Sequence, residues 1–209
     1  MSRCPRCSAV LETPLGCLAC GALAPLGGSD PGPFEILGIA PSFAVDVQDL
    51  RRRLLRLSRM THPDFFATAA PDERQRAERA TAMLNAAYAT LTDDAARAEH
   101  LVLSLGGPDE NAERAMPPAF LEEALEWNEA IEAAKAGGEG GRDPLRALRE
   151  TLEGKRAEAL EAAGGSLDPL PPHGSPKLTE ARRALNVVRY VDRALGEIEA
   201  LRLSRAEAR

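Results

Sequence analysis

Residues 46–64 have the sequence DVQDLRRRLLRLSRMTHPD, in which a basic helical pattern leads into a turn that contains proline. Asp46 is well placed to cap the first amides of this helix, and Pro63 disfavours helical geometry in the residue before it. The helix is therefore predicted to begin after Asp46 and to end before Pro63. Apolar residues spaced three or four apart mark its buried face: Val47, Leu50, Leu54 and Leu57.

The chain that follows this helix predicts more helix and no sheet. Aromatic residues make up only 4% of the 209 residues, and Ala, Leu, Glu and Arg dominate. We expect a second long helix over residues 72–91, antiparallel to the first, and a short third one that ends before Gly106. The second would bury Ala77, Ala80, Leu84, Ala87 and Tyr88 or Leu91, and the third Ala98, Leu101, Val102 and Leu105.

Residues 117–209 predict a three-helix bundle, which makes the whole protein all-α. Glycine- and proline-rich segments at residues 137–141 and 164–176 are expected to be the two loops between its helices. The residues predicted to form its core are Leu121, Leu125 and Ile131, then Leu145, Leu148, Leu152 and Leu160, then Leu178, Leu185, Val188, Leu195 and Ile198.

Residues 1–29 carry two pairs of cysteines, each with two residues between its members: Cys4, Cys7, Cys17 and Cys20. Two such pairs can complete a tetrahedral thiolate shell around one metal ion. We expect structural zinc in a small ribbon or knuckle. An iron site with the same ligands, a redox pair and four uncoordinated thiols are the alternatives.

The tripeptide His62-Pro63-Asp64 directly follows the basic helix. Proline makes the corner rigid, histidine offers hydrogen-bonding groups, and aspartate can accept both arms of a guanidinium. Before Pro63 five arginines occur with no acidic residue after Leu50: Arg51, Arg52, Arg53, Arg56 and Arg59. A simple turn with an aspartate cap, and a solvated helix face, would give the same pattern.

This combination resembles the J-domain, in which a His-Pro-Asp loop joins the second helix to the third; here it would span residues 31–107. The resemblance implies that the loop and the basic face contact an ATPase chaperone and favour ATP hydrolysis, without doing chemistry themselves. The residues implied are His62, Pro63, Asp64, Arg51, Arg52, Arg56 and Arg59.

Residues 94–105, 120–127 and 188–192 further resemble HscB-type co-chaperones, of which some members carry a four-cysteine extension. Such proteins deliver an IscU-like iron–sulfur scaffold to an HscA-type chaperone and stimulate its ATPase. The resemblance implies a scaffold-binding bundle with contacts from Leu121, Leu125, Glu126, Glu129 and Tyr190. Residues 117–136 hold five glutamates and one lysine, which suits a basic and apolar partner. Bundle core and ordinary solvated surface are the alternative interpretations.

Other functional classes fit less well. A general J-protein for unfolded clients would share the J-domain but would bind denatured chains. A zinc ribbon that binds nucleic acid conflicts with the net charge of −6. We find no phosphate loop or nucleophile motif, so we expect no enzyme. With no leader or membrane-length apolar run, a cytoplasmic protein is expected, or one of the mitochondrial matrix if a leader has been removed.

Overall fold

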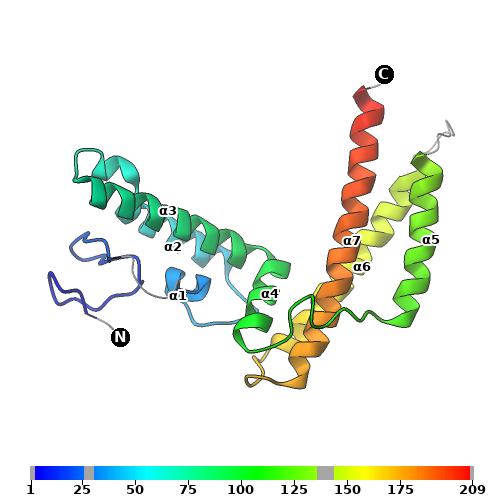
Figure 1. Ribbon diagram of the computed structural model, residues 1–209, viewed down its shortest axis with the longest axis horizontal. Helices are drawn as coiled ribbons and strands as arrows, with labels where there is room; N and C mark the ends of the chain where they lie inside the picture. The colour runs from blue at the N-terminus through cyan, green and yellow to red at the C-terminus, as the bar shows by residue number, and fades with distance from the viewer. Residues whose placement is uncertain (1–2, 26–30, 136–143, 208–209) are drawn as a thin grey trace. The chain divides into compact units, whose positions relative to one another are not determined.

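The computed structural model describes residues 3–25, 31–135 and 144–207. Their regular structure is helical, with extended backbone limited to three isolated bridges inside residues 3–23. The elements are α1 (Pro33–Leu37), α2 (Val47–Thr61), the 3-10 turn η1 (Pro63–Phe66), α3 (Pro71–Thr92), α4 (Asp94–Ser104), α5 (Pro118–Lys135), α6 (Pro144–Leu167) and α7 (Pro176–Glu207). The predicted all-α fold is confirmed (Figure 1).

The chain divides into two compact units, Met1–Arg97 and Ala98–Arg209. The boundary between the units falls inside α4, because the units are defined by which residues contact one another in space. The domain limits predicted from the sequence are instead placed where the amino-acid composition changes. Those limits, 1–29, 31–107 and 117–209, stay a prediction. Among the described residues, no helix combines the length and the apolar character needed to cross a membrane.

In the first unit, α2 and α3 form the predicted helical hairpin, and α1 packs against α3 (Figure 1). Asp46 caps α2 as expected, since its carboxylate accepts hydrogen bonds from the amides of Gln48 and Asp49 at 2.8 and 3.2 Å. The predicted core of α3 is buried, with Leu91 rather than Tyr88 as its last member. The two helices meet through buried side chains that include Leu50, Leu57, Ala77, Ala80 and Leu84.

In the second unit, α5, α6 and α7 form the predicted three-helix bundle (Figure 1). The predicted burial of Leu121 and Leu125 is wrong, because these side chains are 45% and 66% exposed. The predicted burial of Ile131 is confirmed, and it belongs to a stripe on the neighbouring side of α5: Phe120, Ala124, Trp127, Ile131 and Ala134. The aromatic rings of this stripe interlock, since Phe120 contacts Trp127 edge-to-face at 5.5 Å between ring centroids.

The predicted loop over residues 164–176 is shorter than expected, because α6 continues through Gly164 and Gly165 to Leu167. A glycine in a helix costs about 1 kcal/mol relative to alanine. Ala163 and Leu167, one turn apart, are both fully buried, and their burial offsets that cost. The other predicted loop, residues 137–141, lies outside the described residues.

Candidate functional site

The His62-Pro63-Asp64 corner lies where α2 ends and η1 begins. His62 is the C-cap residue of α2 and has an extended backbone conformation, and Pro63 is the first residue of η1. The Nδ1 atom of His62 accepts a hydrogen bond from the amide of Asp64 at 3.2 Å. Because Nδ1 is the acceptor, the neutral imidazole carries its proton on Nε2. The corner thus presents a ring donor and an exposed carboxylate to solvent.

The arginines of α2 differ in what they contact. Arg53 donates to Asp49 at 2.6 Å and to the carbonyl oxygen of Gly38 at 2.9 Å, so it joins α2 to the end of α1. Arg52 also reaches Asp49, at 3.2 Å. The hydrogen bond from Arg53 is the main reason why the pKa of the Asp49 carboxyl lies below its usual value. Arg52 and Arg53 are therefore partly neutralised by an acid that the sequence places one turn earlier.

Arg51, Arg56 and Arg59 are all exposed, but only Arg56 has an ion-pair partner within the described residues. Its guanidinium lies 2.7 Å from the Glu12 carboxylate, which belongs to the cysteine-containing segment. The spacing of residues on α2 could not reveal this pair, because its members are 44 positions apart. The uncompensated positive charge of the basic face is therefore concentrated at Arg51 and Arg59.

The four cysteines converge, and their sulfur atoms all lie within 4.8 Å of one another. The pair Cys4 and Cys7 and the pair Cys17 and Cys20 lie on the same kind of turn. In each turn the carbonyl oxygen of the first cysteine accepts a hydrogen bond from the amide four residues later. Those bonds, from Ser8 to Cys4 and from Gly21 to Cys17, are both 2.8 Å long. Both turns contain left-handed backbone, at Ser8 (φ 60°) and Gly21 (φ 71°). The sulfur separations are 3.7 Å for Cys4 and Cys20 and 3.5 Å for Cys7 and Cys17.

This ligand set fits a thiophilic metal ion, because four thiolates at such distances need a cation to offset their charge. Amide hydrogen bonds, chiefly from Cys7, lower the pKa of the Cys4 thiol to about 7. The pKa of Cys7 is lowered by the amide of Ala9, but hydrogen bonding with Cys17 and Cys20 and burial raise it to about 12. Backbone amides and neighbouring sulfurs therefore shift the pKa values of these two thiols in opposite directions.

The cysteine segment packs against the helical hairpin. The hydroxyl of Thr13 donates to the carbonyl oxygen of Ile36 at 2.7 Å, and both Thr13 and Leu15 are buried. A side chain at Gly38 would place its Cβ 2.5 Å from the carbonyl oxygen of Glu12, so only glycine permits this approach. Gly16 is required for a similar reason, because its Cβ would lie 2.7 Å from the backbone carbonyl oxygen of Ala22, and this glycine also lies against the sulfur of Met60 in α2. The four-cysteine cluster is thus anchored to α1 and α2.

An apolar and acidic strip runs along the exposed side of α5. Leu121 and Leu125 are one turn apart and exposed, and Glu126 and Glu129 are exposed beside them. Tyr190 reaches α5 from α7, where its ring meets Phe120 at 5.5 Å and its hydroxyl accepts a hydrogen bond from Asn128 at 2.6 Å. Asn128 was not among the predicted residues, since only the tertiary structure brings it to Tyr190.

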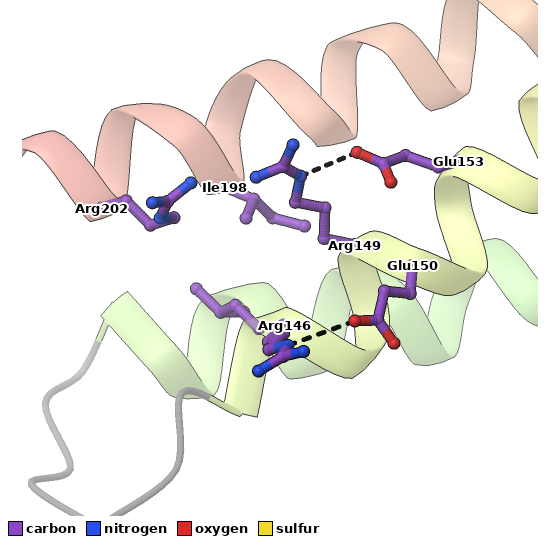
Figure 2. A pocket seen from close by; sticks show the side chains of 7 residues that line it. Arg146, Arg149, Glu150, Glu153, Ile198 and Arg202 are labelled. Atoms are coloured by element: carbon purple, nitrogen blue, oxygen red, sulfur yellow. Dashed lines mark hydrogen bonds and ion pairs between the residues drawn. The ribbon is translucent and has the colours of Figure 1, made fainter.

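A pocket of about 380 Å³ lies between α6 and α7 near the end of the bundle. Figure 2 shows that its charged side chains pair along α6, with Arg146 bonded to Glu150 and Arg149 to Glu153. The other residues that line it are Leu145, Ile198 and Arg202. This lining offers no thiol, imidazole or hydroxyl, and its paired charges are those of a solvated surface.

Comparison with known proteins supports one assignment throughout. Residues 116–199 match a family model described as the HSCB C-terminal oligomerisation domain. The chain is 35% identical over 169 residues to a co-chaperone protein HscB homolog of Burkholderia thailandensis, covering 80% of this chain and 91% of that protein. It is 37% identical over 137 residues to the corresponding homolog of Ralstonia nicotianae, covering 65% and 76%.

Solved structures agree. The chaperone HscB from Vibrio cholerae is 26% identical, with a TM-score of 0.66 and coverage of 83% of this chain and 99% of that one. The human co-chaperone protein HscB has a TM-score of 0.74 at 24% identity, with coverage of 95% and 98%, and supports the fold alone.

Proposed function

This chain belongs to the HscB family of co-chaperones, and from that premise we propose that it delivers an IscU-like iron–sulfur scaffold to an HscA-type chaperone and stimulates its ATPase. As a J-domain co-chaperone of iron–sulfur cluster assembly it acts on a partner enzyme and is not an enzyme itself. We propose that both partners meet it in the cytoplasm.

The observation that carries the chaperone half of this proposal is the His62-Pro63-Asp64 corner beside the basic face of α2. An Nε2–H donor and a carboxylate stand at a rigid turn, and exposed positive charge is added by Arg59 about one turn away and by Arg51 about three turns away. Exposed charge of one sign raises the rate of encounter with an acidic surface, while the corner supplies directional hydrogen bonds. His62, Pro63, Asp64, Arg51, Arg52, Arg56 and Arg59 are the proposed chaperone contacts.

The strip on α5 supports the scaffold half. Leucine side chains that are 45% and 66% exposed are more useful to a partner than to the fold, and acidic residues flank them. A folded scaffold with basic and apolar residues would bury Leu121 and Leu125 and pair with Glu126 and Glu129. Tyr190 would contact the same partner from α7. This geometry suits one folded partner rather than the varied sequences of unfolded clients.

We propose that the metal held by Cys4, Cys7, Cys17 and Cys20 is zinc in a structural role. Four sulfur ligands complete the tetrahedral shell and leave no position for a substrate. Zinc would offset half of the negative charge of the four thiolates, and its bonds to the sulfurs would fix both turns of the segment. Iron in the same shell is the alternative, and metal analysis with an optical spectrum distinguishes them, since only the iron site absorbs visible light.

The test of the whole proposal is the ATPase rate of an HscA-type chaperone with this protein, with and without an IscU-like scaffold. We expect stimulation that the scaffold increases and that His62→Gln abolishes. Stimulation that ignores the scaffold and responds to denatured chains would mean a general J-protein instead.

The match to a domain described as oligomerising gives the bundle a second candidate role, which is self-association. Sedimentation velocity over a range of concentrations separates the two roles. If the α5 strip binds a scaffold and not a second copy of the chain, we expect the wild-type protein to be monomeric. The Leu125→Ala variant should then have the same sedimentation coefficient as wild type.

A further inference from the structure

The carbonyl group of Thr61 stands at the C-terminal end of α2, one residue before His62. The last carbonyl groups of a helix have no partner within the helix. The next residue is extended and the one after it is Pro63, which has no amide proton to donate. Thr61 is fully buried, so water does not substitute for a protein donor. The end of α2 therefore needs a donor from another element.

Thr81 in α3 supplies that donor. Its hydroxyl lies 2.8 Å from the carbonyl oxygen of Thr61 and donates to it across the two helices, which lie side by side (Figure 1). The hydroxyl of Thr61 itself donates back to Leu57 at 3.3 Å. The final turn of α2 is thus held by its own helix on one side and by α3 on the other.

The hydrogen bonds inside the corner act differently. Asp64 donates its amide to Nδ1 of His62, and Phe65 donates its amide to the carbonyl oxygen of His62 at 3.1 Å. Both bonds lie within residues 62–65, so they fix the internal shape of the turn that contains the corner. The bond from Thr81 ties the start of the corner to α3, and so fixes the direction in which the corner projects.

We propose that Thr81 is a positioning residue for the His62-Pro63-Asp64 corner, an inference that rests on the proposed role of this corner in chaperone binding. Without its hydroxyl, the buried Thr61 carbonyl loses its donor and the last turn of α2 gains alternative arrangements. A partner that binds only one arrangement then sees a smaller competent fraction, and its apparent affinity falls by that fraction. The chemistry of the ATPase partner is untouched.

Thr81→Val tests this inference, because valine keeps the shape of threonine and removes only the hydroxyl. Thr92→Val is the matched control, since Thr92 is also half-buried in α3 and also donates at 2.8 Å to a backbone carbonyl, that of Tyr88. We expect Thr81→Val to raise the concentration for half-maximal ATPase stimulation about fivefold, with the maximal rate kept. Thr81→Ser should restore the wild-type value, and Thr92→Val should leave it unchanged.

Imidazole NMR signals provide a second readout that is independent of any partner. The protein has three histidines, so His100 and His173 serve as internal references for His62. We expect Thr81→Val to shift the His62 signals alone and Thr81→Ser to restore them. Equal stimulation by the Thr81→Val and Thr92→Val variants, in a chain that does stimulate, would overturn the inference and leave the proposed function standing. If the wild-type chain stimulates no chaperone, the proposed function fails, and unshifted His62 signals would then overturn the positioning role as well.

Discussion

The guanidinium of Arg182 lies 2.5 Å from a carboxylate oxygen of Glu99, although the Arg182 side chain is entirely buried. Its Nε also donates to the carbonyl oxygen of Pro108 at 3.1 Å. Arg189 pairs with Glu110 on the same side of α7. This network joins the second half of α4 and the segment after it to α7, all within the second unit. Arg182 is the most deeply buried charged side chain among the described residues.

Breaking this pair should destabilise the second unit strongly. Glu99→Gln leaves a buried guanidinium without a counter-charge, which costs about 3 kcal/mol or more. Arg182→Met fills much of the same space without charge. We expect the double variant to be more stable than the Glu99→Gln variant, as measured by urea unfolding followed through Trp127, the single tryptophan. Additive losses would contradict direct coupling.

Removing the metal should destabilise the first unit and leave the second unchanged. Thr13 and Leu15 are held between the cysteine turns and α1, and they lose their fixed places when the turns open. We expect a strong chelator to lower the unfolding temperature of the first unit by about 5 °C or more, which corresponds to a loss of about 1 kcal/mol in its free energy of unfolding. Trp127 fluorescence, which reports the bundle, should not change. Cys17→Ser should mimic the chelator.

Leu125→Ala should weaken scaffold binding about tenfold, because it removes exposed apolar surface that the partner would bury. Leu203→Ala is the matched control, since Leu203 is 58% exposed on α7 and Leu125 is 66% exposed on α5. Calorimetric titration measures the affinity, and circular dichroism should show equal helicity for both variants. Equal affinity of the two variants would remove the α5 strip as the contact.

The stability of the second unit should fall in acid through Asp109 and Glu113. The amides of Ala112 and Asn111 lower the pKa of Asp109, and the amide of Ala115 with Arg183 lowers that of Glu113. A carboxyl group whose pKa is lower in the folded state than in the unfolded state stabilises the fold at any pH above its unfolded-state pKa. This stabilisation is lost as the pH falls through the folded-state pKa. The ordinary pKa values, which apply to the unfolded chain, are 3.8 for Asp109 and 4.5 for Glu113.

Asp109→Ala should therefore lower the free energy of unfolding at pH 7, and the difference from wild type should shrink as the pH drops below about 4. Urea unfolding at pH 7, 5 and 3 measures the trend. A difference that stays constant with pH would assign the effect to lost hydrogen-bond geometry rather than to charge.

Much of this protein was determined by its sequence, since the signals concerned act within a few residues. Asp46 and Pro63 set the two ends of α2 because a cap and a missing amide act on the adjacent turn. The spacing of the four cysteines predicted their cluster because a two-residue gap brings two sulfurs to one ion. The heptad-like leucines and alanines of α3 allowed a single buried face, and that face was predicted correctly.

Other features were decided only by the tertiary structure. Helix α5 offers two apolar stripes, and the contacts of Phe120 with Trp127 and Tyr190, not local spacing, chose which one is buried. Helix α6 continues through Gly164 and Gly165 because packing against α7 outweighs their backbone cost. The pairs Arg56 with Glu12 and Thr81 with Thr61 join residues distant in sequence. Local propensity carries no information about such partners, because their energy exists only once the chain has brought them together.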